Sequence, residues 1–291
     1  MKNCCTFART KRHNSCQTAI MTHFSVLMSV YNKENPDFLR QSLDSIFNQT
    51  LPPSEVVLVQ DGPMDEQLLE VIDRCQAVHP EFKTVKLTEC HGLGGALNEG
   101  LRHCSYDLVA RMDTDDIAKP MRFKTQIEWM EQHPDTAVCG SWIDEFTTDT
   151  SHVISSRKPP RDHQDIVSFA RKRNPINHPT VVFRRQAIEK AGGYQHFYLF
   201  EDYYLWIRMI MAGCKFHNIQ ESLLFFRMSD DMFQRRGGLK YTQSEIKLQR
   251  QFHQMGFIGW GTMIQNMTYR TIVRNMPNKL RRFVYITLLR R

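Results

Sequence analysis

The sequence predicts an α/β protein with a doubly wound, mostly parallel sheet, and two observations lead to this prediction. Apolar runs without polar alternation occupy residues 24–30, 56–59 and 108–112. Such runs are typical of strands that helices cover on both faces of a parallel sheet. The segments between these runs carry apolar residues at helical spacing, so strands and helices alternate along the chain.

The predicted elements follow in a regular order up to Pro120. Leu39, Leu43 and Ile46 share one face of a helix expected over residues 37–48. The other elements of this half are helices over 66–78 and 95–104 and strands over 84–87 and 108–112. Beyond Pro120 the alternation weakens. The strands expected there cover 137–146 and 181–183, and the helices 162–171 and 202–212. This pattern predicts a mixed C-terminal half that extends the same sheet.

The charge distribution argues against a nucleic-acid partner. The 291 residues carry a formal charge of +7, but the basic excess lies at the two ends, and residues 246–291 contain nine Lys or Arg and no Asp or Glu. The body between the ends is net acidic, whereas nucleic-acid binding needs a basic stripe across the folded surface. We therefore expect no nucleic acid among the partners.

The cysteines and the apolar segments indicate in which cell compartment the protein is expected. The eight cysteines show neither a CxxC pair nor the spacing of metal ligands, which predicts reduced thiols and a cytoplasmic protein. No apolar run approaches the ~20 residues that cross a bilayer, and the N-terminus lacks the apolar core of a signal peptide. We expect a cytoplasmic protein that is soluble or peripheral.

The two ends of the chain differ from its body. Residues 1–23 are polar and without periodicity, so we expect a disordered extension. Residues 241–291 are expected to form a helical basic segment, in which 278–291 combine one apolar face with arginines at both ends. Such a segment can lie on an anionic leaflet, which predicts contact with the cytoplasmic face of the inner membrane. The alternative is a helix that packs on the protein, or a frayed terminus.

Three polar clusters follow predicted strands. Tyr31-Asn32, Asp61-Gly62 and residues 113–116 each come directly after an apolar run. In doubly wound sheets, ligands bind beyond the carboxyl ends of the strands, where the strand order reverses. We therefore expect the three clusters to converge on one edge of the sheet.

The third cluster has the composition of a metal site. Asp113, Asp115 and Asp116 bring carboxylates close together, and like charges at short range require a cation or a proton. Oxygen ligands favour Mg²⁺ or Mn²⁺, which bind one or two carboxylates together with substrate phosphates. The alternative is an ordinary turn, in which Asp is common, or a cap for the next helix near Met121.

Four segments, taken in order, resemble the donor half of glycosyltransferase family 2. They are residues 30–32, 59–62, 92–101 and 111–116. A later segment, Phe200-Glu-Asp-Tyr-Tyr-Leu-Trp206, resembles the acceptor-side acidic motif of that family. The members most similar to this chain are those that build bacterial capsule, exopolysaccharide or lipopolysaccharide O-chains.

The resemblance implies a fold and a reaction type. The fold is GT-A, a Rossmann-like sheet, over residues 24–240, with a nucleotide-sugar donor half over 24–119 and an acceptor half over 120–240. The reaction is an inverting transfer, usually from a UDP-sugar, with Mn²⁺ or Mg²⁺ bound at the acidic cluster.

The resemblance also implies which residues contact the donor. The backbone after Val30 and the carboxylate of Asp61 hold the nucleobase, since a carboxylate can accept the imide N–H of uracil. An Asp-Gly turn is the alternative for Asp61. Among the candidate metal ligands Asp113, Asp115 and Asp116, we expect Asp115 to be the principal one and Asp113 to contact the ribose or to support the metal site indirectly; which two of the three face the metal stays open. The donor contacts as a set are Val30, Tyr31, Asn32, Glu34, Asp61, Gly95, Asn98, Arg111, Asp113, Thr114, Arg235 and Arg236.

Arg235 and Arg236 lead into a glycine pair, Gly237-Gly238. Guanidinium groups suit a diphosphate, and glycines suit a loop that closes over the donor and opens again. A solvated basic loop is the alternative.

Three residues are expected on the acceptor side. By resemblance, Asp202 is the general base that takes the proton of the acceptor hydroxyl, because a sugar hydroxyl is a poor nucleophile until it begins to lose that proton. The alternative is that Asp202 only caps the helix that follows it. Glu201 is expected to orient the acceptor, and His178 to line its site.

These features together predict transfer of a hexose, or of an N-acetylated hexose, from UDP to a hydroxyl of a lipid-linked or growing saccharide. One alternative is a sugar-1-phosphate nucleotidyltransferase. It requires a glycine-rich basic loop after the first strand, where this chain has Tyr31-Asn32-Lys33-Glu34. The other alternative is a non-catalytic scaffold on a membrane surface.

Overall fold

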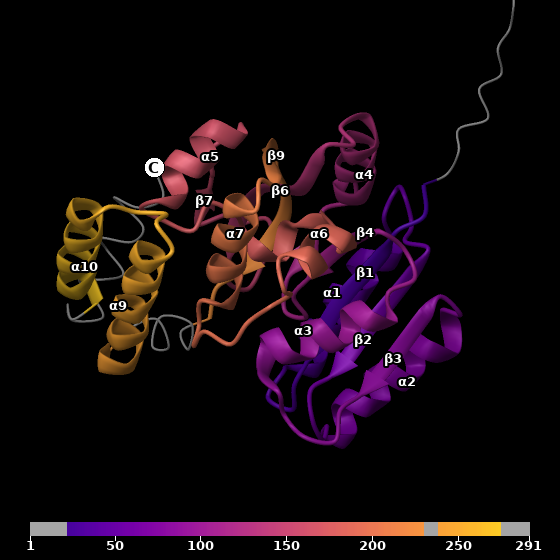
Figure 1. Ribbon diagram of the computed structural model, residues 1–291. Coiled ribbons are helices and arrows are strands. Elements are labelled where there is room, and N and C mark those ends of the chain that lie inside the picture. Colours follow the sequence, from indigo (N-terminus) through magenta and orange to yellow (C-terminus); the bar gives the residue numbers. More distant parts are fainter. Residues whose placement is uncertain (1–21, 230–237, 275–291) are drawn as a thin grey trace, which may run out of the picture.

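The computed structural model describes residues 22–229 and 238–274, in which helices cover both faces of a central sheet (Figure 1). The first half alternates strand and helix, as expected. Its elements are β1 (Ser25–Val30), α1 (Pro36–Phe47), β2 (Glu55–Gln60), α2 (Glu66–Val78), β3 (Phe82–Lys86), α3 (Gly92–His103) and β4 (Leu108–Met112). Strands β1, β2 and β4 are almost wholly buried, because their continuous apolar runs face helices on both sides.

The second half mixes strand directions. Its elements are β5 (Ile117–Ala118), α4 (Arg122–Gln132), β6 (Thr136–Phe146), β7 (Ser155–Arg157), α5 (His163–Ala170), β8 (Val182–Arg184), α6 (Arg185–Lys190), α7 (Glu201–Met211), β9 (Lys215–Arg227), α9 (Gly238–Gln254) and α10 (Trp260–Arg274). The described strands form one sheet in the order β3-β2-β1-β4-β8-β6-β9-β5, with β7 beside β6. Strands β4 and β6 pair antiparallel with β8, whereas β6 and β9 run parallel. The predicted α/β fold with a mixed C-terminal half is confirmed.

The register of the parallel strands brings the predicted polar clusters to one edge. Met28 in β1 lies opposite Met112 in β4, and Val30 lies opposite Gln60 at the end of β2. The strand order reverses at β1, between β2 and β4, which is where ligands bind in sheets of this type. Tyr31, Asp61 and Asp113 therefore follow neighbouring strand ends.

Two apolar cores lie on opposite faces of the sheet, and a third lies at one end. Helices α1, α2 and α4 cover one face, and α3 and α7 cover the other. The opposite side of α7 packs against α9 and α10 through Tyr203, Leu248 and Phe252. Helix α7 thus connects the sheet to the C-terminal helix pair, which lies far from β3 (Figure 1).

The structure corrects one helix boundary that matters for the site. Helix α3 begins at Gly92 rather than at Gly95, so the glycines lie inside its first turn. Its N-cap residue, His91, donates its backbone N–H to the Asp61 carboxylate (2.7 Å), which supplies a capping acceptor that the helix's own sequence lacks.

Several predictions fall outside the described residues or at their limits. Residues 1–21, the loop that contains Arg235 and Arg236, and the basic segment 275–291 are not described. Helix α9 begins at Gly238, close to the predicted start of the C-terminal segment. In the described parts of the chain, no helix has the length and apolar character needed to span a bilayer.

Candidate active site

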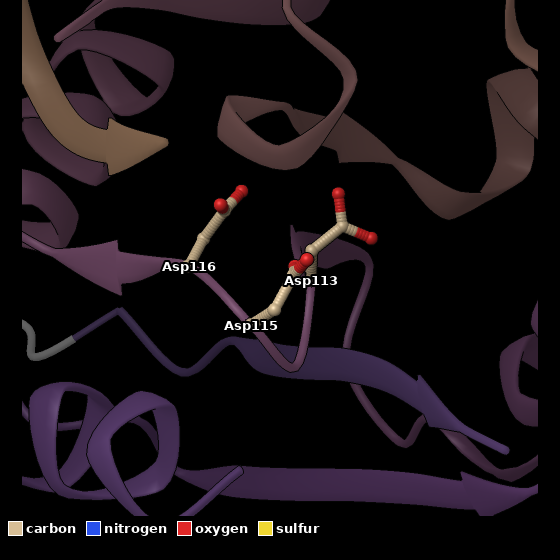
Figure 2. Close-up of side chains that lie close together, drawn as sticks. All are labelled: Asp113, Asp115 and Asp116. Atoms are coloured by element: carbon tan, nitrogen blue, oxygen red, sulfur yellow. The ribbon is translucent and has the colours of Figure 1, made fainter. Parts of the chain in front are cut away.

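The acidic cluster occupies the turn between β4 and β5, at the switch point of the sheet. Figure 2 shows Asp113, Asp115 and Asp116 close together on this turn. One carboxylate oxygen from each of the three lies within 4.8 Å of the others. Neither Asp115 nor Asp116 caps helix α4, whose N-cap residue is Met121, so the capping alternative is wrong.

Neighbouring elements hold this turn in place. The Ser42 hydroxyl of α1 donates to the Asp113 carbonyl (2.9 Å). Arg227, the last residue of β9, donates its backbone N–H to Asp116 Oδ1 and its Nε–H to the Asp115 carbonyl, both at 2.8 Å. Because α1 and β9 both bind the turn, the carboxylates are presented by a rigid scaffold.

The electrostatics of the turn favour a bound cation. Burial, together with the charges of Asp113 and Glu34, raises the pKa of Asp115 to about 7. Burial, together with the charges of Asp115 and Asp113, raises the pKa of Asp116 well above its usual value. Asp116 Oδ2 is buried and has no hydrogen-bond partner in the described chain. These oxygen donors fit a hard divalent cation such as Mn²⁺ or Mg²⁺, which would satisfy them and relieve their mutual repulsion.

Arg111 adds a positive charge directly beneath the turn. Its guanidinium is buried and forms an ion pair with Asp113. Its Nε and Nη1 atoms have no hydrogen-bond partner among the described residues. A buried arginine with spare donors can receive an anionic group that the apolar surroundings would otherwise exclude.

The predicted nucleobase residues lie beside the turn, at the ends of β1 and β2. The Asp61 carboxylate accepts the His91 N–H at 2.7 Å and the Cys90 thiol at 3.2 Å. The Val30 carbonyl accepts the Asp61 N–H at 2.8 Å. The side chains of Tyr31 and Asn32 are exposed.

Glu34 connects this region to the acidic turn. Its Oε2 atom accepts a hydrogen bond from the Thr114 hydroxyl at 2.6 Å. The predicted contacts Glu34 and Thr114 are therefore in direct contact, although 80 residues separate them in the sequence.

Asn98, predicted as a donor contact, joins the two halves of the chain. Its amide donates to the Tyr194 carbonyl at 2.6 Å and accepts the Tyr194 N–H at 2.8 Å. Close packing continues at Gly95, where a Cβ would lie 2.7 Å from the His91 Cβ. Helix α3 is thus fastened to the acceptor half at Asn98.

A cavity of about 610 Å³ connects the acidic turn to the predicted acceptor side. Arg111 and Asp113 line it, as do His178, Glu201 and Asp202. The structure therefore brings the metal-side and acceptor-side predictions to one cavity, although 65 to 91 residues of sequence separate them.

Asp202 lies in the first turn of α7 and is held from two sides. Asn174 Nδ2 donates to its Oδ2 at 2.6 Å, and the Tyr203 backbone N–H donates to its Oδ1 at 2.7 Å. Burial raises the pKa of Asp202, and the bond from Asn174 partly opposes that rise. The N-cap residue of α7 is Phe200, so the alternative in which Asp202 is the cap is wrong.

Burial also shifts the pKa values of the other acceptor-side residues, His178 and Glu201. His178 Nε2 lies 2.8 Å from the Tyr194 hydroxyl, and burial next to Arg111 holds the pKa of His178 well below its usual value. Its imidazole is therefore neutral at pH 7. Burial also raises the pKa of Glu201.

Three residues of the site were not expected from the sequence. Asn174 orients Asp202, Tyr194 binds both Asn98 and His178, and Arg227 holds the acidic turn. None lies in a recognisable motif, and each acts on residues distant in sequence. Only the fold identifies them.

The family assignment follows from comparison with known proteins. The model of glycosyl transferase family 2 matches residues 25–192, which include the acidic turn and His178. The chain belongs to glycosyltransferase family 2. It is accordingly a glycosyltransferase, and the nucleotidyltransferase and scaffold alternatives are set aside.

Curated relatives align over nearly the whole chain. A UDP-Gal:α-D-GlcNAc-diphosphoundecaprenol β-1,3-galactosyltransferase of Escherichia coli is 38% identical over 268 residues, covering 92% of this chain and 97% of the relative. The amylovoran biosynthesis glycosyltransferase AmsE of Erwinia amylovora is 43% identical over 265 residues, covering 90% and 97%.

Solved structures show the same fold at low sequence identity. The mannosyltransferase PcManGT of Pyrobaculum calidifontis, in complex with GDP-Man and Mn²⁺, is 18% identical with a TM-score of 0.62, covering 89% of this chain and 71% of that chain. S. aureus TarS 1–349 in complex with UDP-GlcNAc is 14% identical with a TM-score of 0.60, covering 89% and 69%. The glycosyltransferase described here has the GT-A fold.

Proposed function

We propose that this transferase moves a sugar from a UDP-sugar to a hydroxyl of a lipid-linked acceptor, with inversion, in the synthesis of a surface polysaccharide. The observation that carries the proposal is the shared cavity, in which Asp202 and the acidic turn face one space. Two relatives support the pathway, since one is named for a diphosphoundecaprenol acceptor and the other for amylovoran biosynthesis.

The donor residues bind and orient the nucleotide sugar. Asp61 accepts a hydrogen bond from the base, and Arg111, with its two unpartnered donors, faces the diphosphate. Asp115, with Asp113 or Asp116, would hold Mn²⁺ or Mg²⁺. That cation supplies positive charge, which stabilises the diphosphate as the bond to the sugar breaks.

Asp202 activates the acceptor. Its carboxylate takes the proton of the acceptor hydroxyl while that oxygen forms a bond to the anomeric carbon. The bond from the anomeric carbon to the phosphate oxygen breaks, and its electron pair leaves with UDP. Asn174 keeps the Asp202 carboxylate in one orientation through its 2.6 Å hydrogen bond. The neutral imidazole of His178 and the carboxyl group of Glu201 position the acceptor ring.

A contact with an anionic membrane surface is part of the proposal. On α10, Trp260, Ile264 and Ile272 are 66%, 56% and 57% exposed. Their spacing of four and eight residues puts them on one side of the helix. Residues 275–291, whose predicted membrane contact lies outside the described residues, contain five Lys or Arg and no acid. Apolar and basic side chains in this combination suit an anionic leaflet.

Titrations of UDP with and without Mn²⁺, and a variant of Asp202, test the proposal. Calorimetry with UDP is expected to give binding that depends on Mn²⁺, and UDP binding indifferent to the metal would contradict the donor assignment. Asp202→Asn is expected to keep UDP affinity and to lower transfer by at least ~100-fold. Asp165→Asn, which changes an exposed carboxylate of α5, serves as the control. Near-normal turnover in the Asp202 variant would show that another group is the base.

A further inference from the structure

Four cationic side chains of the cavity lining gather around the loop after α5. Lys172 and Arg173 belong to this loop, Arg270 donates to the Lys172 carbonyl, and Arg157 donates to the Asn174 carbonyl. These four residues are here called the basic end of the cavity. Glu245 pairs with Arg270, and Asp202, bonded to Asn174, lies beside the same loop. Positive charge concentrated in a partly enclosed space favours an anionic ligand.

The donor diphosphate does not account for this basic end. The predicted nucleobase residues Val30, Tyr31 and Asp61 are absent from the described lining of the cavity. The proposed nucleobase site lies at the ends of β1 and β2, next to Asp61. An anion bound near Arg173 is therefore a second anion, on the acceptor side of Asp202.

An ion pair and hydrogen bonds hold the basic end in place. Arg270 of α10 pairs with the buried Glu245 of α9 and donates to the Lys172 carbonyl. Asn266 Nδ2 donates to the Arg171 carbonyl at 2.8 Å. These bonds hold the loop after α5 against the C-terminal helices. Lys172 and Arg173 are consequently presented to the cavity from a fixed backbone.

The same loop reaches the catalytic base. Asn174, which donates to Asp202 at 2.6 Å, immediately follows Arg173, and its carbonyl accepts a hydrogen bond from Arg157. Consecutive Cα atoms are about 3.8 Å apart, so the two cationic residues branch from the chain one and two residues from the residue that orients the base. When a hydroxyl of the acceptor sugar contacts Asp202, a group on the opposite side of that sugar would lie toward Lys172 and Arg173.

We propose that Lys172 and Arg173, positioned by Arg157 and Arg270, form a subsite for the diphosphate of a sugar-diphosphate acceptor. This inference rests on the proposed transfer to a lipid-linked saccharide and names the part of that acceptor which the enzyme recognises. Guanidinium and ammonium groups bind phosphate oxygens through charge-assisted hydrogen bonds. Tyr269 and Val273 of α10, on either side of Arg270 in the sequence, also line the cavity and would accommodate the first carbons of the lipid.

Calorimetry with two matched soluble acceptors tests the subsite. One is N-acetylglucosamine 1-diphosphate carrying a short alkyl ester, and the other is the alkyl glycoside of the same sugar without phosphate. The wild-type protein is expected to bind the diphosphate at least about tenfold more tightly, because two charge-assisted contacts are added. The double variant Lys172→Gln/Arg173→Gln should lose this preference. Arg171→Gln, which removes an exposed neighbouring arginine that does not line the cavity, should keep it.

Other outcomes would overturn the subsite. Equal binding of the two acceptors by the wild-type protein would do so, as would a preference that survives in the double variant. Short-chain phosphatidylglycerol, titrated in parallel, separates an acceptor site from a site for phospholipid headgroups. If it binds as tightly as the sugar diphosphate and with the same dependence on Lys172 and Arg173, the acceptor assignment is contradicted. UDP titration of the same samples reports on the proposed function separately, since the donor contacts lie outside these substitutions.

Discussion

Asn174 donates a 2.6 Å hydrogen bond from Nδ2 to Oδ2 of Asp202, joining the loop after α5 to the first turn of α7. The bond opposes the effect of burial, which raises the pKa of Asp202. The proposed base must be ionised to act, so activity is expected to be lost as pH falls through this raised pKa. The position of the acid limb therefore depends on Asn174.

Asn174→Ala should move the acid limb of the kcat/KM profile to higher pH. Removing a hydrogen bond to a charged group costs about 1.5–3 kcal/mol, which corresponds to about one to two pH units for the ionisation of Asp202. The measurement is kcat/KM across the pH range, with activity recovering toward high pH. An unchanged acid limb would show that the bond does not tune the base.

Asp115→Asn should weaken the Mn²⁺-dependent part of UDP binding at least about tenfold, because the proposed principal ligand loses its charge. Without metal, the same variant should melt no lower than the wild-type protein, since one of three mutually repelling carboxylates is neutralised. Calorimetry and thermal melting, each with and without Mn²⁺, measure the two effects. The exposed Asp149→Asn is the control, and unaltered metal dependence in the Asp115 variant would reassign the ligand.

Gly193→Ala should destabilise the protein more than Gly213→Ala. Both glycines have positive φ (+64° and +82°), so both changes carry a backbone cost of about 1–2 kcal/mol. A Cβ at Gly193 would also lie 2.7 Å from Asn98 Oδ1, whereas nothing lies within 4 Å of one at Gly213. The first change therefore disturbs the Asn98–Tyr194 bonds as well. Urea midpoints compare the two, and equal losses would mean that the contact contributes nothing.

Replacing Trp260, Ile264 and Ile272 together by Ser should reduce association with anionic liposomes without lowering the melting temperature. These side chains are largely exposed, so their loss removes apolar area that inserts into lipid but little that packs in the core. Val78→Ser, at a residue 72% exposed on α2, is the control for the loss of an exposed apolar group. Liposome flotation measures association, and unchanged flotation of the triple variant would exclude α10 from the contact.

The donor half was predictable because its signals are local. Each buried strand there is a continuous apolar run, and the polar clusters follow the runs directly, so the strand ends and the acidic turn could be inferred without the structure. The convergence of Asp61 and Asp113 follows from the parallel register alone.

The acceptor half was less predictable because its structure depends on distant pairing. Strand β9 has an irregular pattern of buried and exposed residues and register shifts against β6, so it has no clear period. Its last residue, Arg227, reaches the acidic turn 111 residues away. The contact between Asn174 and Asp202 likewise forms only when α5 and α7 are in place. No local pattern encodes such pairs.

Helix α10 takes part in two surfaces, since Tyr269 and Arg270 line the cavity while Trp260, Ile264 and Ile272 point to solvent. With its apolar side resting on lipid as proposed, the helix itself becomes a spacer. An α-helix with its side chains is about 10 Å across, so the catalytic base would work at a nearly constant height above the bilayer. This fixed height would make the enzyme select acceptors by the distance between their reacting hydroxyl and the bilayer. It would favour the first sugars of a chain over the far end of a long one.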